Sequence, residues 1–322
     1  MIPRPQLQAY LAGSHRRPAP PALHWREQPV LARLHDALEA LPERSSAAIG
    51  ALVERLFADT AWLEHWVARL AQAAAADPFF DPPLVVNGNK HQRGLVVFSH
   101  DCLALTLNVL AIDALAAKKA HRRGPGVIVF TGGRSVQKFL KGGGALLQLW
   151  SAPPSDAAFS LAEAHRCAPA GYHAIEDGEI LTIDGRTQSY VIDHAVSDIM
   201  VLQADLRVDR APLLVEYDAQ TLLAVGASST NDGASRSQML LSFLSMRGRA
   251  GDADILERYT HDDAFYLRWH AARELLGMDV DRAMDRLRAM ELVDPHPDIR
   301  GAARSALSML VGQAAGAAPC HA

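Results

Sequence analysis

The chain has few cysteines, and their spacing excludes two kinds of scaffold. There are three, Cys102, Cys167 and Cys320, among 322 residues. No two of them stand in a Cys-x-x-Cys pair, so the sequence indicates neither a disulfide framework nor a zinc knuckle. Sparse free thiols are typical of a reducing compartment. We therefore expect buried or incidental thiols and a cytoplasmic location.

The sequence also lacks long apolar runs and a strong charge of either sign. No stretch approaches the roughly 18 apolar residues of a membrane span. Residues 1–21 are rich in proline and arginine and lack the apolar core of a signal peptide. The formal net charge is −4 and the pI about 6.4, which favours neither nucleic acid nor an anionic membrane as a partner.

What is present is the composition of a folded chain, 49% hydrophobic and 21% charged. Prolines oppose a helix in residues 1–24, which we expect to be an irregular arm. In residues 25–77, leucines at 31, 34 and 38 begin a helical period that recurs twice more. We therefore predict three short amphipathic helices that form a helical cap.

The helical period disappears in residues 78–234, and short apolar, β-branched runs replace it. Gly, Pro and Asp-Gly signals separate these runs, and Asp184-Gly185 predicts a hairpin tip. Eight strands without intervening helices indicate an all-β sandwich or barrel. The predicted strands are Gly94–Ser99, Leu103–Ile112, Val127–Thr131, Ala145–Trp150, Glu179–Ile183, Ser189–Ile192, Ile199–Leu206 and Leu213–Tyr217.

The middle of this region resembles a cupin-type jelly roll. Ala170-Gly171 and Asp177-Gly178-Glu179 occupy the places of the turns that lead into cupin strands. The resemblance runs from Gly94 to near Ser228 and implies a jelly-roll barrel. Metal-dependent cupins carry a His-x-His pair on one strand, and this chain has none. The family's metal ligands therefore cannot be transferred to it.

Two matching helical segments lie near the C-terminus. Residues 267–275 align without gaps on residues 299–307, which begin 32 residues later. Each copy has an apolar residue before an arginine, alanines in the middle and a leucine at its end. The pattern resembles HEAT repeats, which implies stacked helix pairs that bind other macromolecules. We expect such repeats over 235–312, followed by a disordered tail at 313–322.

The repeat assignment predicts particular contacts. The arginine of one copy, Arg268 or Arg300, should form hydrogen bonds within the stack. The apolar positions of both copies should be buried at equivalent places in successive helices. These positions are Leu267, Ala271, Leu275, Ile299, Ala303 and Leu307.

Histidines in predicted turns offer a candidate metal site. His100, His173 and His194 could converge at one rim of a barrel, with Glu176 or Asp198 as the carboxylate. Two histidines and one carboxylate suit Fe(II), Zn(II) or Ni(II). No two of these histidines have ligand spacing, so separate turn residues are the alternative interpretation.

A second candidate is a basic stretch between glycines. Arg134, Lys138 and Lys141 lie between Gly132-Gly133 and Gly142-Gly143-Gly144. Glycine amides and basic groups together can bind an anion. No Gly-Lys-Ser/Thr follows, so this is not a phosphate loop. The alternative is a strand with flexible ends and a solvated basic edge.

These observations favour an α+β multidomain protein with a helical cap, a cupin-like β domain and a helical-repeat tail. Its expected function is recognition of a protein, a peptide or a small ligand through the barrel mouth and the repeat surface. The alternative is a divergent metal-dependent cupin-type enzyme, oxygenase-like, at the barrel mouth. The sequence does not decide whether the chain is an enzyme, because it has no Gly-x-Ser-x-Gly or other catalytic signature.

Overall fold

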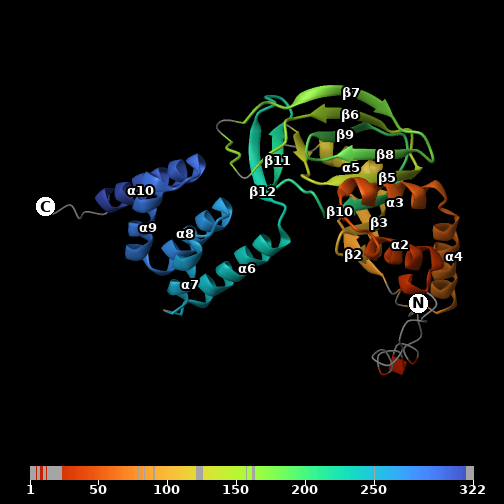
Figure 1. Cartoon of the computed structure of the whole chain (residues 1–322), viewed down its shortest axis with the longest axis horizontal. Helices are drawn as coiled ribbons and strands as arrows, with labels where there is room; N and C mark the ends of the chain where they lie inside the picture. The colour runs from red at the N-terminus through yellow and green to blue at the C-terminus, as the bar shows by residue number, and fades with distance from the viewer. Residues whose placement is uncertain are drawn as a thin grey trace. The chain divides into compact units, whose positions relative to one another are not determined.

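A computed structural model describes residues 24–77, 84–89, 91–120, 126–156, 158–161, 164–249 and 251–316, with isolated positions outside these ranges. Most of the predicted arm therefore lies outside the described residues. The chain divides into two compact units, each with segments from separate parts of the sequence (Figure 1). The first contains Met1–Gly124, Gly133–Trp150 and Pro169–Arg210, and the second contains Pro125–Gly132, Ser151–Ala168 and Ala211–Ala322.

The predicted helical cap is present and belongs to the first unit. Its buried leucines keep the spacing seen in the sequence, with Leu31, Leu34 and Leu38 on one side of the first long helix. Ser45 begins the next helix, because its hydroxyl accepts a hydrogen bond from the Ala48 amide at 3.2 Å. The elements are η3 (Trp25–Glu27), α2 (Pro29–Glu39), α3 (Ser46–Ala58) and α4 (Ala61–Ala76).

The helices of the cap cover one face of an antiparallel six-stranded sheet of the order β1-β2-β3-β10-β5-β8. Side chains alternate along its central strand: Leu202 and Ala204 pack with the helices, whereas Ile199 and Val201 belong to the other core. The strands are β1 (Val85–Gly88), β2 (Gln92–His100), β3 (Leu103–Leu110), β5 (Arg134–Lys141), β8 (Ile180–Asp184) and β10 (Ile199–Leu206).

A three-stranded sheet and a short helix belong to this second core of the unit. The sheet has the order β7-β6-β9, with β6 (Leu146–Ser151) between β7 (Ala168–Ala174) and β9 (Gln188–His194). The helix is α5 (Ile112–Ala120), and its first residue packs against the core. The buried members of this core are Phe139, Ala145, Leu147, Ile175, Ile199 and Val201.

All eight predicted strands are confirmed, but the strand prediction was incomplete. β1, β5 and β7 were missed, as was β12 (Ala224–Ser229), because polar residues or glycines interrupt their apolar patterns. Asp184-Gly185 does form a turn, in which Thr187 donates to the Asp184 carbonyl at 3.0 Å. The hairpin prediction was nevertheless wrong, since β8 and β9 belong to different sheets. The turn carries the chain from one sheet to the other.

In its described residues, the second unit combines a small sheet with five helices. The sheet has the order β12-β11-β4, where β4 (Val127–Phe130) and β11 (Leu213–Asp218) are antiparallel. None of the helices among the described residues has the length and apolar character to cross a membrane. The helices are α6 (Asp232–Arg247), α7 (Asp252–Tyr259), α8 (Phe265–Met278), α9 (Val280–Val293) and α10 (Pro297–Gly316).

The two matching segments adopt equivalent environments on α8 and α10. Five of the six apolar positions are buried, as predicted, whereas Leu307 is only half-buried. Arg268 donates to the carbonyl oxygens of Asp262 and Asp263, and Arg300 donates to those of Asp294 and Pro295. Each arginine thus bonds to carbonyls six and five residues before it. The sequence repeat is therefore also a structural repeat, while its HEAT classification stays a prediction.

One apolar face in this region is largely exposed. Met239, Leu240, Phe243 and Leu244 recur at helical spacing and so share one face of a helix. On α6, Met239, Leu240 and Phe243 are 70%, 62% and 59% exposed. We call the five helices α6 to α10 the helical stack. Leu241 is the residue of this apolar segment that is buried in the core of the stack. The apolar face of α6 is thus wider than its contact with the other helices.

Candidate functional site

The first unit contains a cavity of about 330 Å³ between α5 and β9. This volume falls within the range typical of small-ligand sites. Its walls are mainly apolar, and both elements contribute. The residues that line it are Ile112, Leu115, Ala116, Lys119, Tyr190, Val191, Ile192, Asp193, His194 and Ala195.

The start of α5 is fixed by a contact that is distant in sequence. The carboxylate of Asp198 accepts a hydrogen bond from the Ile112 amide at 3.0 Å. An acceptor at this position satisfies one of the unpaired amides of a helix N-terminus. Asp198, which the sequence suggested as a metal ligand, thus helps to position one wall of the cavity.

Lys119 joins the other end of α5 to β9. Its Nζ donates to the carbonyl oxygens of Ile192 and Asp193 at 2.6 and 2.7 Å. An ammonium group has three N–H donors, so a third remains for a further acceptor. His194 lines the cavity next to Asp193, and its Nδ1 lies 3.2 Å from a carboxylate oxygen of Asp193. The polar groups of the cavity are therefore gathered at one end.

Tyr190 connects the cavity to the core between the two sheets. Its hydroxyl donates to the side-chain carbonyl of Gln137 at 2.8 Å. Burial raises the pKa of Tyr190 above its usual value, against the effect of this hydrogen bond. The phenol therefore stays neutral at physiological pH and acts as a fixed donor toward Gln137.

The structure does not bring the three histidines of the predicted metal site into one ligand group. His100, at the end of β2, faces Glu39 with Nε2 2.7 Å from Oε1. His173 on β7 lies 2.5 Å from Glu179, and His194 pairs with Asp193. Each histidine thus has a carboxylate partner of its own. Glu176 is not the partner of His173, although its amide donates to Glu179.

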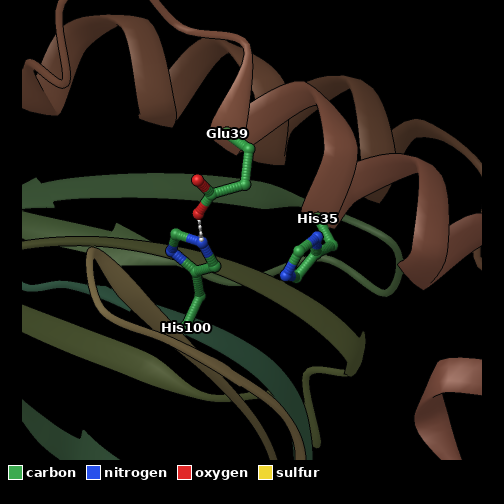
Figure 2. A group of neighbouring side chains, drawn as sticks. All are labelled: His35, Glu39 and His100. Atoms are coloured by element: carbon green, nitrogen blue, oxygen red, sulfur yellow. Dashed lines mark hydrogen bonds and ion pairs between the residues drawn. The ribbon is translucent and has the colours of Figure 1, made fainter.

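His100 belongs instead to a group that the sequence did not suggest. Donor atoms of His35, Glu39 and His100 all lie within 4.8 Å of one another (Figure 2). His35 and Glu39 lie one turn apart on α2, and His100 reaches them from the sheet below. The spacing of His35 and Glu39 was the only local signal, and a four-residue spacing on a helix recurs too often to identify a site.

The basic residues of the predicted anion site lie along β5 rather than in a glycine loop. Arg134 and Lys138 stand four residues apart on this strand, and Lys141 follows a register shift at its end. The glycines after β5 form a turn in which Gly143 has a φ of 61°. A Cβ at Gly143 would lie 2.4 Å from the Ser197 carbonyl oxygen, so the turn itself requires glycine. Anion binding by these residues stays a prediction.

Comparison with known proteins finds similarity to solved structures alone. No protein-family profile matches the chain, and no curated protein matches its sequence. Among solved structures, a cupin-2 domain from Rhodospirillum rubrum has 11% identity and a TM-score of 0.25, over 48% of this chain and 80% of that one. A cupin domain from Bordetella pertussis has 11% identity and a TM-score of 0.22, over 40% and 99%.

A third match is a protein of unknown function from Vibrio parahaemolyticus. It has 14% identity and a TM-score of 0.21, over 38% of this chain and 96% of that one. Several matches are thus cupin domains, in keeping with the α+β chain and its antiparallel sheets. At these TM-scores the likeness carries no argument about activity or ligand.

Proposed function

We propose that this chain is a recognition protein whose first unit binds a small, mainly apolar molecule with one acceptor group. The observation that carries the proposal is the cavity of about 330 Å³ between α5 and β9. Apolar walls with a few polar groups at one end are typical of such binding sites. Lys119 offers an N–H to the acceptor, and a carboxylate is the acceptor that matches its charge.

A cupin-type metal enzyme is less well supported at this cavity. Among the residues that line it, only Asp193 and His194 carry groups that commonly bind metal ions. Metal-dependent catalytic sites typically use three protein ligands. Binding without chemistry is therefore the function that the cavity favours.

The test compares two neighbouring positions on α5. Both are exposed, but Ala116 lines the cavity and Ala117 does not. The full-length protein is screened against aliphatic and aromatic carboxylates by thermal shift, and hits are titrated calorimetrically. Ala116→Phe should weaken binding by about 10-fold or more, since overpacking a site typically costs 1–3 kcal/mol. Ala117→Phe should leave the affinity within about 2-fold, a change of roughly 0.4 kcal/mol.

Two results would count against the proposal. One is the absence of any saturable binding across both carboxylate series. The other is an equal effect of Ala116→Phe and Ala117→Phe, because the bound molecule would then lie elsewhere. Lys119→Met provides a second measure, since it should weaken carboxylates more than the matching alcohols.

The helical stack favours recognition of a protein as a second function. Met239, Leu240, Phe243 and Met246 lie on one face of α6 and are 59–87% exposed. Contiguous apolar surface of this kind marks interaction sites on soluble proteins. Phe243→Asp should abolish any co-purifying protein complex without lowering the stability of the stack, as measured by circular dichroism.

A further inference from the structure

We propose that His35, Glu39 and His100 form a binding site for a divalent transition metal ion, with Zn²⁺ as the preferred ion. Two imidazoles and one carboxylate form a donor set that suits such ions. The site lies between α2 and the end of β2, on the helix-covered face of the six-stranded sheet. It shares no residue with the cavity beside α5, so either proposal can fail alone.

The geometry of α2 supplies two of the ligands. Residues four apart lie on the same face of a helix, so His35 and Glu39 project toward the same point. His100 completes the group from a different element, 61 residues after Glu39 in sequence. Ligand atoms around a tetrahedral zinc ion are about 3.3 Å apart, given bonds of 2.0–2.1 Å. The present separations extend from 2.7 to at most 4.8 Å, so side-chain shifts of about 1 Å suffice.

His100 is held in place for this role. Its side chain is only 6% exposed, and its ring lies parallel to Phe98 with centroids 6.4 Å apart. Nδ1 lies 3.0 Å from the sulfur of Cys102. A metal-bound histidine usually gives its other N–H to an acceptor that fixes the ring. The sulfur of Cys102 can take that part when Nε2 binds the ion.

Glu39 is prepared as an anionic ligand. Its Oε1 faces His100, and its Oε2 accepts a hydrogen bond from Arg44 at 2.9 Å. The hydrogen bond from His100 and the nearby Arg44 lower the pKa of Glu39. The carboxylate is therefore ionised at neutral pH. Its side chain is 52% exposed, so water can reach the ion and occupy a fourth position.

Metal binding requires the ring proton of His100 to move from Nε2 to Nδ1. Without metal, Nε2 of His100 donates to Glu39, and Nδ1 accepts from the Cys102 amide at 3.3 Å. With metal, Nε2 bonds to the ion, and the ring proton resides on Nδ1 beside the sulfur. The carboxylate of Glu39 then bonds to the ion instead of to the ring.

The full-length protein, stripped with a chelator and then freed of it, provides the test. Zn²⁺ is titrated against a chromophoric competitor, and Co²⁺ is used as a spectroscopic probe of the ligand set. We expect one Zn²⁺ per chain. We also expect the bound Co²⁺ to absorb visible light, as it does in a coordination site of low symmetry. His35→Gln should weaken Zn²⁺ binding by more than about 100-fold. Cys102→Ser should weaken it by about 10-fold, the lower end of the loss of metal affinity seen when a residue that hydrogen-bonds a metal ligand is replaced.

A matched control exists in the same unit. His173 and Glu179 also form a close histidine–carboxylate pair, but no third donor among the described residues joins them in a ligand group. His173→Gln should leave Zn²⁺ affinity within about 2-fold. His35 is 42% exposed, so its replacement leaves the fold intact, which a melting curve without metal verifies. Absence of stoichiometric Zn²⁺ binding, or equal losses in His35→Gln and His173→Gln, would overturn the proposal.

Discussion

The helical stack and the first unit, called the β unit below, place their buried charged groups in different surroundings. In the stack, Arg268 bonds to both carboxylate oxygens of Asp294 at 2.8 and 3.0 Å and to two backbone carbonyls. Both side chains are almost fully buried, at 8% and 1% exposed. In the β unit, His100 is equally buried, but its partner Glu39 is half exposed. The first pair is closed in that both side chains are almost fully buried, although the two residues line a cavity of about 440 Å³. The second pair is open to solvent through its half-exposed carboxylate.

This difference separates a structural charge pair from a candidate site. A buried pair is stable only when its remaining hydrogen-bonding groups are satisfied. Arg268 meets that condition with four hydrogen bonds, all to residues within 26 positions in sequence. The group around His100 has water access and a third donor, His35. The predictions that follow test this contrast in order of decreasing effect.

The largest effect is expected when the closed pair is broken. Arg268→Met leaves the carboxylate of Asp294 buried without its cation, which typically costs 3–5 kcal/mol. Arg300→Met removes only hydrogen bonds to carbonyl oxygens and should cost about 1 kcal/mol. Denaturant unfolding monitored by circular dichroism measures both. Equal losses in the two variants would show that the carboxylate adds nothing to the repeat contact.

The same pair predicts the acid sensitivity of the stack. Burial opposes ionisation of Asp294, but the hydrogen bond and charge of Arg268 prevail and lower its pKa. A lowered folded-state pKa contributes stability above the unfolded pKa, and that contribution disappears as pH falls through the folded value. The wild-type stack should lose stability below about pH 4, and Asp294→Asn should show a flatter profile there.

An intermediate effect is expected at the buried hydrogen bond of the β unit. Tyr190→Phe leaves the Gln137 carbonyl without the hydroxyl, and an unpaired buried acceptor costs roughly 1–3 kcal/mol. Tyr172, which is 61% exposed, is the matched control, and Tyr172→Phe should change stability by less than about 0.5 kcal/mol. Thermal unfolding distinguishes them. A Tyr190→Phe protein as stable as wild type would mean that water replaces the hydroxyl.

The smallest effect is expected at the open pair in the absence of metal. Exposed ion pairs are screened by solvent. Glu39→Gln should therefore destabilise the protein less than Arg268→Met or Tyr190→Phe does. The hydrogen bond from His100 lowers the pKa of Glu39, so its contribution is present at neutral pH and disappears as pH falls through that pKa. Melting temperatures of wild type and Glu39→Gln should therefore converge as the pH falls below the usual pKa of a glutamate. A gap that widens on acidification would contradict the assignment.

The helices and most strands could be predicted because their patterns are local. Leu31, Leu34 and Leu38 lie at helical spacing and are buried on α2. The 32-residue repeat predicted both the burial of Ala271 and Ala303 and the bonds of the arginines. Periodicity fails where the apolar pattern is interrupted. β5 contains arginine, glutamine and lysines, so a strand was only the alternative to an anion-binding stretch there.

The candidate sites depended on contacts that no local pattern contains. His100 meets Glu39 across 61 residues, and Asp198 fixes the start of α5 across 86. The histidines at 100, 173 and 194 shared a predicted position in turns, yet each lies beside a different carboxylate. The α5 wall of the cavity was itself not predicted, because Ile112 was assigned to a strand.

The sequence by itself therefore determined the order of helical and β regions and the burial within the repeat, since side chains three or four positions apart share one face whenever a helix forms. The tertiary structure alone decided which strands share a sheet, and thereby which ligands meet. A carboxylate on α2 and an imidazole at the end of β2 come together only when the helices cover the sheet. Such pairings follow from burial of whole faces, which is non-directional and leaves no signature at the two residues concerned.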